Sequence, residues 1–324
     1  MAGSRVAPVR IGIIGAGAIG GFYGVMLARA GHDVHFLLRS EFTAVQAAGW
    51  KVESAVHGSL DLPRVQACQS IDEMPASDWL LVAAKTTSNT ALAPLLNQAA
   101  ASGARIVLLQ NGLGVEAALR PLLDDNLHLL GGLCSICVHR QAPGVIVHQS
   151  LGQVSLGYHS GPASTQAERE ILLEEGADLF RSAGLEASTL ASLEQGRWQK
   201  LVWNVPYNGL AVLLEAGTSA LMDNPDSRAL ILSLMEEVVS AAEACGHSMP
   251  EGYPQRLLRS TDRMPDYLPS MVHDFRHGRG LELQAIYEAP LRAAEAAGCP
   301  LPRVRMLLQA LHFIDRRNCR ENGQ

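Results

Sequence analysis

The distribution of apolar residues along the chain changes character near residue 190. Before that point, short apolar runs alternate with segments in which apolar residues recur every three or four positions. This alternation is typical of parallel strands joined by covering helices. Beyond it, the short runs disappear and long amphipathic segments follow. The pattern predicts an α/β domain over residues 1–189 and an all-α domain over residues 190–324.

The apolar runs and periodic segments also locate the elements that we expect. Buried strands of a parallel sheet are predicted at 11–14, 33–38, 78–84 and 105–109, and hairpin strands that extend the sheet at 127–138, 144–148 and 154–158. Helices are predicted at 41–48, 89–101, 165–182, 192–214, 225–245, 281–297 and 303–320.

The first predicted strand runs directly into a glycine-punctuated turn and a helix. The turn reads Gly15-Ala16-Gly17-Ala18-Ile19-Gly20, the G-x-G-x-x-G pattern of dinucleotide-binding sites. Gly15 permits the tight turn, Gly17 lets a pyrophosphate approach the backbone, and Gly20 lets the helix pack closely on its strand. The helix N-terminus then offers N–H groups to the phosphates. The sequence therefore predicts a Rossmann-type dinucleotide-binding domain, with a turn that binds no ligand as the alternative.

The end of the second predicted strand bears on which dinucleotide is bound. An NAD site carries Asp or Glu about 20 residues beyond the last glycine, where this chain has Arg39 and Ser40. Arginine can form paired hydrogen bonds with a 2′-phosphate, and a serine hydroxyl can donate beside it. We therefore expect NADP(H) as the cofactor. Lys85 and Asn111 follow the next two strands, at the sheet edge where ligands of open α/β sheets bind.

Composition and charge exclude several classes of protein. The chain is 48% apolar and 18% charged, as expected of an ordinary globular protein. A net charge of -6 and the absence of lysine runs argue against nucleic acid as a partner. The six cysteines show no disulfide framework, so we expect a cytoplasmic protein without a metal site. No apolar run approaches the roughly 18 residues that a membrane span requires.

The most informative polar residues of the second half lie on one predicted helix. Lys200, Asn204 and Asn208, which we call the polar stripe, are spaced four apart and line one helix face, whereas the residues between them are almost all apolar. Buried amides need partners, since an unpaired one costs on the order of 1–3 kcal/mol. Other side chains or a ligand must therefore satisfy the stripe, and we favour a ligand-lined cleft. Pro206 should kink this helix.

Two more polar residues have local explanations as well as functional ones. Ser270 precedes a predicted apolar segment and could cap a helix. Glu282 lies near the start of a predicted helix and could complement the helix dipole. Neither residue alone indicates a functional site.

Taken together, these residues resemble the ketopantoate reductase (2-dehydropantoate 2-reductase) family over nearly the whole chain. The glycine turn, Arg39, Lys85, Asn111, the polar stripe, Ser270 and Glu282 occur in the order of that family. The resemblance implies an NADP-dependent oxidoreductase that reduces a 2-keto acid to a 2-hydroxy acid in a cleft between the domains. The implied reaction converts 2-dehydropantoate to pantoate in pantothenate and coenzyme A biosynthesis.

The resemblance also implies roles for individual residues. Lys200 would be the general acid, with Glu282 close to it and to the cofactor. Asn111 would lie beside the nicotinamide, while Arg39, Ser40 and Lys85 would contact the rest of the nucleotide. The implied substrate-binding set is Asn111, Lys200, Asn204, Asn208 and Ser270.

Two departures from the family pattern bear on the substrate. Thr218 replaces an Asn that the family commonly has, and Tyr287-Glu288 stands in a segment where the family differs. Both are expected on the substrate side. One alternative is therefore a related reductase of another 2-keto acid or opine-type substrate. A separate alternative is a non-catalytic NADP(H)-binding sensor, which would be marked by loss of the proton donor, whereas Lys200 is present. The two C-terminal helices could form a homodimer contact or pack within their own domain.

Overall fold

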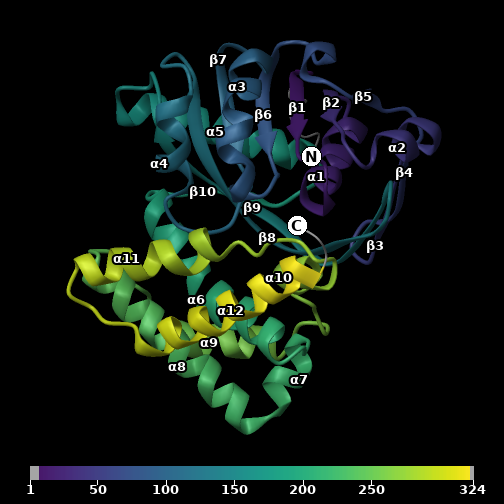
Figure 1. Ribbon diagram of the computed structural model, residues 1–324. Coiled ribbons are helices and arrows are strands. Elements are labelled where there is room, and N and C mark those ends of the chain that lie inside the picture. Colours follow the sequence, from purple (N-terminus) through teal and green to yellow (C-terminus); the bar gives the residue numbers. More distant parts are fainter. Residues whose placement is uncertain (1–6, 322–324) are drawn as a thin grey trace. The chain divides into compact units, whose positions relative to one another are not determined.

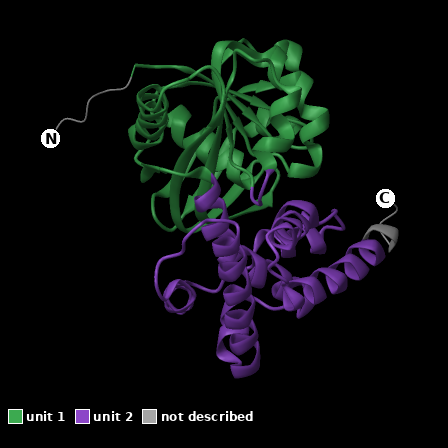
Figure 2. Ribbon diagram, turned by 90° about the vertical axis from the view of Figure 1, so that its left-hand side faces the viewer, with its two compact units in different colours: residues 1–110, 115–193 green, residues 111–114, 194–324 purple. Residues whose placement is uncertain are grey.

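The computed structural model describes residues 7–321 and divides into two units (Figure 2). The first unit comprises residues 1–110 and 115–193, and the second comprises residues 111–114 and 194–324. The chain stays with the first unit as far as Leu193, four residues beyond the predicted boundary at 189. Two contacts explain this: the Leu190 N–H donates to the Leu156 carbonyl, 2.7 Å away, and Leu193 fills the space beside Gly131 and Gly157.

The first unit is built on a single mixed sheet of ten strands (Figure 1). Their order is β4-β3-β9-β8-β7-β6-β1-β2-β5, with β10 beside β9. The strands are β1 (Arg10–Ile14), β2 (Asp33–Leu37), β3 (Trp50–Ser54), β4 (Gly58–Leu62), β5 (Gln66–Cys68), β6 (Ser77–Val82), β7 (Ala100–Leu108), β8 (His128–Ala142), β9 (Val145–Ser160) and β10 (Ala187–Thr189).

The Rossmann-like part of this sheet is parallel, as the sequence predicts. Strand β1 pairs with β2 on one side and β6 on the other, and β7 and β8 continue the parallel order beyond β6. Ile11, Ile13 and Ile14 of β1 are at most 1% exposed, because both faces of a central parallel strand are covered. The chain therefore leaves β1 at the switch point of the sheet, where ligands of open α/β sheets bind.

The predicted hairpin extension is present and longer than expected. Strands β8 and β9 pair antiparallel from Leu129 opposite Ser160 to Ala142 opposite Val145. The three separate apolar runs of the sequence therefore belong to only two strands. The interruption near residue 150 is a bulge, at which Leu151 has a positive φ of 65°.

The first unit contains the predicted helices in their predicted order, together with one five-residue helix, Val115–Leu119, that the sequence does not predict. They are α1 (Ala18–Arg29), α2 (Phe42–Ala48), α3 (Asn89–Ala99), α4 (Val115–Leu119) and α5 (Gln166–Ser182), with short 3-10 helices at Ile71–Glu73, Thr86–Ser88 and Arg120–Leu122. Helix α5 begins in a capping box, in which the Glu168 N–H donates to Thr165 Oγ1 and the Thr165 N–H donates to the Glu168 carboxylate.

The second unit is helical. Its elements are α6 (Leu193–Leu213), α7 (Thr218–Asp223), α8 (Pro225–Ala244), α9 (Tyr253–Thr261), α10 (Ser270–Arg276), a π-helix (Gln284–Glu288), α11 (Ala289–Ala296) and α12 (Pro302–Glu321). Helices α7, α9 and α10 were not predicted, because six to nine residues are too few to establish a clear helical period. The single α-helix predicted at 281–297 is wrong in its first half. The structure has a π-helix at Gln284–Glu288 and an α-helix only from Ala289 to Ala296.

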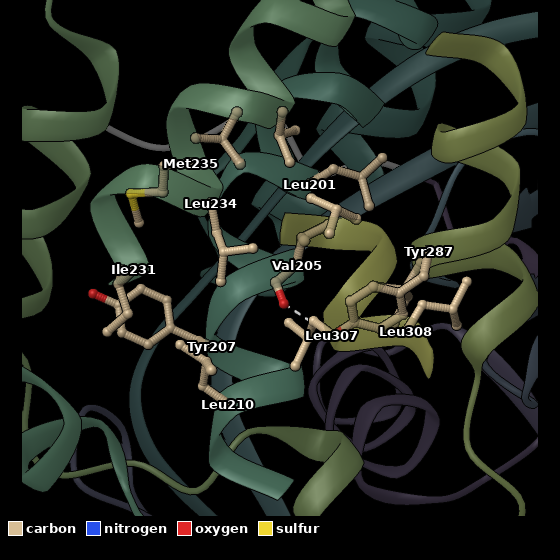
Figure 3. Close-up of a cluster of buried hydrophobic side chains, with 14 of the residues drawn as sticks. Leu201, Val205, Tyr207, Leu210, Ile231, Leu234, Met235, Tyr287, Leu307 and Leu308 are labelled. Atoms are coloured by element: carbon tan, nitrogen blue, oxygen red, sulfur yellow. Dashed lines mark hydrogen bonds between the residues drawn. The ribbon is translucent and has the colours of Figure 1, made fainter. Parts of the chain in front are cut away.

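Helix α6 lies at the centre of the core of the second unit (Figure 3). Leu201, Val205 and Leu210 of α6 pack with Ile231 and Leu234 of α8. Tyr287 completes the cluster from the π-helix, and its hydroxyl donates to the Val205 carbonyl over 2.9 Å. Each of these side chains is at most 1% exposed. The apolar residues between the members of the polar stripe therefore fix α6 in the core of the second unit.

A buried histidine connects two hairpins of the first unit. His148 of β9 is 1% exposed, and its Nδ1 lies 2.8 Å from Ser54 Oγ of β3. Its Nε2 lies 3.1 Å from the carbonyls of Ser150 and Leu151. Because carbonyls only accept, Nε2 carries the proton and Nδ1 accepts from the serine. Burial lowers the pKa of His148, with a further contribution from the neighbouring His57.

This arrangement predicts that the first unit loses stability in mild acid. The unfolded chain takes up a proton near the ordinary histidine pKa of 6.5, whereas folded His148 does so only at a lower pH. The free energy of unfolding should be constant above pH 7.5 and fall below pH 6.5, by at most about 1.4 kcal/mol per pH unit for this residue. Urea unfolding midpoints across this range measure the slope.

The His148→Gln variant is the control for that measurement. It should show a smaller slope between pH 6.5 and the lower pH at which folded His148 takes up its proton. The remaining slope comes from His32, His35, His128 and His139, because burial lowers their pKa values as well. A slope equal to that of the parent would mean that His148 does not contribute.

Candidate active site

Four loops leave the parallel sheet at the same edge. Ile14 is paired with both Leu37 and Val82, and Val82 is paired with Leu108. These residues end, or nearly end, their strands. The glycine turn, Arg39, Lys85 and Asn111 therefore follow strand ends that lie side by side. This is the edge at which the sequence places the nucleotide.

The three glycines of the turn are required for different reasons. Gly15 has a φ of 87°, and a Cβ there would lie 2.3 Å from the backbone nitrogen of Ala84. A Cβ on Gly20 would lie 2.6 Å from the Gly15 carbonyl. By contrast, a Cβ on Gly17 would meet no protein atom within 4 Å. Internal packing explains the first and third glycines, whereas the open space at Gly17 fits the approach of an external group.

The start of α1 also fits an anion. Gly17 is its N-cap and provides no side-chain cap, and the first turn contains no acidic residue. The first N–H groups of a helix lack partners within the helix. A diphosphate would supply acceptors for them and would interact favourably with the helix dipole.

Arg39 is exposed just beyond β2, and among the described residues its guanidinium forms no hydrogen bond or ion pair. Ser40 Oγ lies 3.5 Å from the Glu41 carboxylate. That carboxylate is 4% exposed, forms an ion pair with Arg140 and accepts the Gly144 N–H over 2.8 Å. The Glu41 carboxylate is thereby engaged by Arg140 of β8 and by the Gly144 N–H, and Arg39 is available for an anionic ligand.

Lys85 and Asn111 each follow, along the chain, a residue of a hydrogen-bond network that the sequence analysis did not identify. Gln110 exchanges two hydrogen bonds with Asn89, at 3.0 and 2.6 Å, and its Nε2 donates to the Ala84 carbonyl over 2.7 Å. Gln110 is 4% exposed and Asn89 9%. This amide pair ties the end of β7 to the loop that carries Lys85, which is partly exposed.

The polar stripe lies on α6, and its members have different environments. Lys200 is partly exposed. Asn204 is only 5% exposed, and its Nδ2 has no hydrogen-bond partner among the described residues. A buried amide donor without a partner destabilises the fold unless something else satisfies it. Asn204 therefore fits contact with a ligand.

Asn208 has protein partners. It is 2% exposed, its Nδ2 donates to the Asn204 carbonyl over 3.1 Å, and its Oδ1 accepts the Met271 N–H over 3.3 Å. Met271 lies in the first turn of α10, whose N-cap is Pro269 and has no side-chain cap. The prediction that Ser270 could cap this helix is therefore wrong. Ser270 is its first residue and is exposed, and Asn208 takes an N–H of the first turn.

The two departures from the family pattern have structural roles in this chain. Thr218 is 2% exposed, and its Oγ1 accepts the Tyr267 N–H over 2.9 Å, while its own N–H donates to the Tyr267 carbonyl. Tyr287 is fully buried, and burial raises the pKa of its hydroxyl well above the usual value. The expectation that both face the substrate side is not supported by these contacts, because each side chain is engaged in the protein interior.

Other chemistry finds little support in residues 7–321. The described side chains contain no group of three or more His, Cys, Asp and Glu that could hold a metal ion. Cys134 and Cys137 are buried and form no disulfide among the described cysteines, and burial raises the pKa of Cys137, which disfavours the reactive thiolate. Within the same range, none of the helices combines the length and apolar character that a bilayer crossing needs.

A Rossmann-like sheet with this glycine turn, together with a helical unit that carries the polar stripe, defines a two-unit, dinucleotide-dependent oxidoreductase. Comparison with protein families identifies it further. Residues 11–161 match the family described as "Ketopantoate reductase PanE/ApbA", and residues 192–315 match its C-terminal domain. The chain belongs to the ketopantoate reductase family.

Individual relatives agree with this assignment. The chain is 40% identical over 306 residues to the 2-dehydropantoate 2-reductase of Nostoc sp., with 94% of this chain and 95% of that protein covered. The crystal structure of 2-dehydropantoate 2-reductase from Geobacter metallireducens has a TM-score of 0.87 and 38% identity, covering 94% of this chain and 99% of that one. A D-mandelate dehydrogenase complex with NADH shares the fold, with a TM-score of 0.82 at 17% identity.

Proposed function

We propose that this protein reduces 2-dehydropantoate to pantoate with NADPH, in the cytoplasm, as a step of pantothenate and coenzyme A biosynthesis. The first unit would hold the nucleotide, and the second would hold the keto acid. The name 2-dehydropantoate 2-reductase of the relatives in Nostoc and Geobacter supports this substrate. The homodimer that the sequence leaves open stays a prediction, which sedimentation equilibrium would test.

Asn204 is the observation that carries the proposal. Its amide is buried beside Lys200 on the same helix face, yet its Nδ2 has no partner among the described residues. A chain that only needed α6 for packing would be more stable with an apolar residue at this position. The donor is explained if it binds an oxygen of the keto acid. The carboxylate and carbonyl of a 2-keto acid present acceptors for a lysine and an amide.

The residues of the polar stripe suit the reduction of a ketone. Bound NADPH would supply the hydride to the carbonyl carbon. As this carbon–hydrogen bond forms, the electron pair of the C=O π bond moves to oxygen. We propose that the Lys200 ammonium hydrogen-bonds this oxygen, stabilises its negative charge and then donates the proton that gives the hydroxyl. Glu282 would orient the ammonium group, and Ser270 would bind the substrate from the start of α10.

The residues at the sheet edge suit NADPH. We propose that the turn at residues 15–20 and the N-terminus of α1 bind the diphosphate, and that Arg39 and Ser40 bind the 2′-phosphate. Lys85 would contact the nucleotide from the loop after β6, and Asn111 would lie beside the nicotinamide. The open position at Gly17 and the unpaired guanidinium of Arg39 support this assignment.

Alanine substitutions at Asn204 and Asn208 should separate binding from stability. Asn204→Ala removes no side-chain hydrogen bond among the described residues and also removes the unpaired buried donor, so the free energy of unfolding should not fall. Its kcat/KM for the keto acid should fall roughly ten- to a hundredfold. Asn208→Ala removes the partner of the Met271 N–H and should lower stability by about 1–3 kcal/mol.

Urea unfolding and steady-state kinetics on both variants measure these effects. The two asparagines lie one turn apart with similar burial, so each serves as the control for the other. If Asn204→Ala lost stability and kept its activity, the Asn204 amide would have a structural role. The unpaired Nδ2 would then no longer support a contact with the keto acid.

A further inference from the structure

The turn that carries Asn111 is held by the π-helix of the second unit. Residues 111–114 follow strand β7 of the first unit along the chain, but their contacts group them with the helical unit. The Leu113 N–H donates to the Ala285 carbonyl over 2.9 Å. Gly112 lies against the same residue, since a Cβ built on it would be 2.4 Å from the Ala285 Cβ and 2.6 Å from its carbonyl oxygen.

The Ala285 carbonyl can accept the Leu113 N–H because it lies in a π-helix and because a proline stands five residues further on. In the π-helix the Ala289 N–H donates to the Gln284 carbonyl, five residues back. The next bond of this pattern would join the N–H of residue 290 to the Ala285 carbonyl. Residue 290 is a proline and has no N–H. The Leu113 N–H occupies the position that the helix leaves without a donor.

The two glycines of the turn differ in what surrounds them. Both have positive φ values, 105° at Gly112 and 72° at Gly114, so any side chain is strained at either position. Only Gly112 is confined by a neighbour, because a Cβ on Gly114 would meet no atom within 4 Å. The conformation of the turn therefore requires both glycines, whereas its contact with Ala285 requires Gly112 alone.

We propose that Gly112, Ala285 and Pro290 are positioning residues that set the place of Asn111 in the reaction. This inference rests on the proposed function, in which Asn111 lies beside the nicotinamide. The amide of Asn111 would be held by the unit that carries the polar stripe, whereas the nucleotide would be held by the other unit. Displacement of the turn should therefore impair hydride transfer and leave nucleotide affinity unchanged.

The Gly112→Ala variant tests the contact, and Gly114→Ala is its matched control. A displacement of about 1 Å in a reacting group can cost roughly a hundredfold in rate, so Gly112→Ala should lower the hydride-transfer rate by roughly ten- to a hundredfold. Its Kd for NADPH should stay within about twofold of the parent. Gly114→Ala shares the strained φ without the clash, so it should lose less thermal stability than Gly112→Ala and keep a rate close to that of the parent.

Two readouts separate positioning from a general loss of structure. With NADPH deuterated at the transferred position, the kinetic isotope effect on kcat should rise in Gly112→Ala, because hydride transfer becomes more rate-limiting. Amide exchange of Leu113 should be slow in the parent and in Gly114→Ala, and fast in Gly112→Ala. The second readout needs no substrate, so it remains informative if 2-dehydropantoate is not reduced.

Pro290→Ala provides a second route to the same result if Gly112→Ala does not fold. It restores an N–H at residue 290 that would compete with the Leu113 N–H for the Ala285 carbonyl. It should therefore speed amide exchange of Leu113 and lower the hydride-transfer rate, although no residue of the turn is replaced. Equal rates in Gly112→Ala and Gly114→Ala, or protected Leu113 exchange in Gly112→Ala, would overturn the inference. A parent protein that binds NADPH and reduces no keto acid would instead overturn the proposed function.

Discussion

Replacing Lys200 by alanine is expected to lower kcat by roughly a hundredfold or more, because general-acid catalysis contributes on that scale. The ammonium group is the only donor of the polar stripe that can both stabilise negative charge on the substrate oxygen and release a proton to it. The affinity for NADPH should change little, since the residues proposed to bind the diphosphate and the 2′-phosphate lie in the first unit. Steady-state kinetics and fluorescence titration of NADPH measure the two quantities.

Gln199→Ala is the matched control for Lys200. Gln199 precedes Lys200 on α6 and is likewise partly exposed, but it points about 100° around the helix from the stripe. It should keep parental turnover and parental stability. Near-parental turnover in Lys200→Ala would remove Lys200 as the acid, and an equal loss in Gln199→Ala would indicate a defect of the helix instead.

Reversing the charge at Arg39 is the second substitution with a large expected effect. Arg39→Asp removes charge-assisted hydrogen bonds to the 2′-phosphate, each worth about 1.5–3 kcal/mol, and adds repulsion. The Kd for NADPH should rise on the order of a hundredfold or more, whereas the Kd for NADH should change by less than about threefold. Titrations with both nucleotides measure the difference.

Arg64→Asp makes the same change of charge at another exposed position of the first unit. It should leave both affinities close to those of the parent, because no proposed nucleotide contact lies there. Equal losses of NADPH and NADH binding in Arg39→Asp would contradict the 2′-phosphate assignment and return the choice of cofactor to an open question.

The parts of the fold that depend on local patterns could be predicted from the sequence. The alternation of apolar runs and helical periods identified the Rossmann-like sheet, because parallel strands are buried on both faces and read as continuous apolar segments. The glycine turn, Arg39 and Lys85 follow strand ends, so their common edge follows from the parallel order. The stripe on α6 was visible because its spacing matches the helical period.

The parts that depend on contacts between distant residues could not be predicted. Nothing in the sequence indicates that Asn208 takes an N–H of α10, or that the turn after Asn111 belongs with the helical unit. The π-helix was read as an ordinary helix, since one extra residue per turn hardly alters the apolar pattern. Tyr287 was assigned to the substrate side because a family comparison marks where residues change and does not show where they point.

The oxidation of NADPH by the purified protein with 2-dehydropantoate is the measurement that decides whether the protein is a 2-dehydropantoate reductase. Pyruvate and branched 2-keto acids complete the panel, with NADH run in parallel on every substrate. We expect rapid turnover of 2-dehydropantoate with NADPH, and much slower turnover with NADH and with the other acids. Tight binding of NADPH without turnover of any keto acid would contradict this expectation and favour a sensor of the nucleotide.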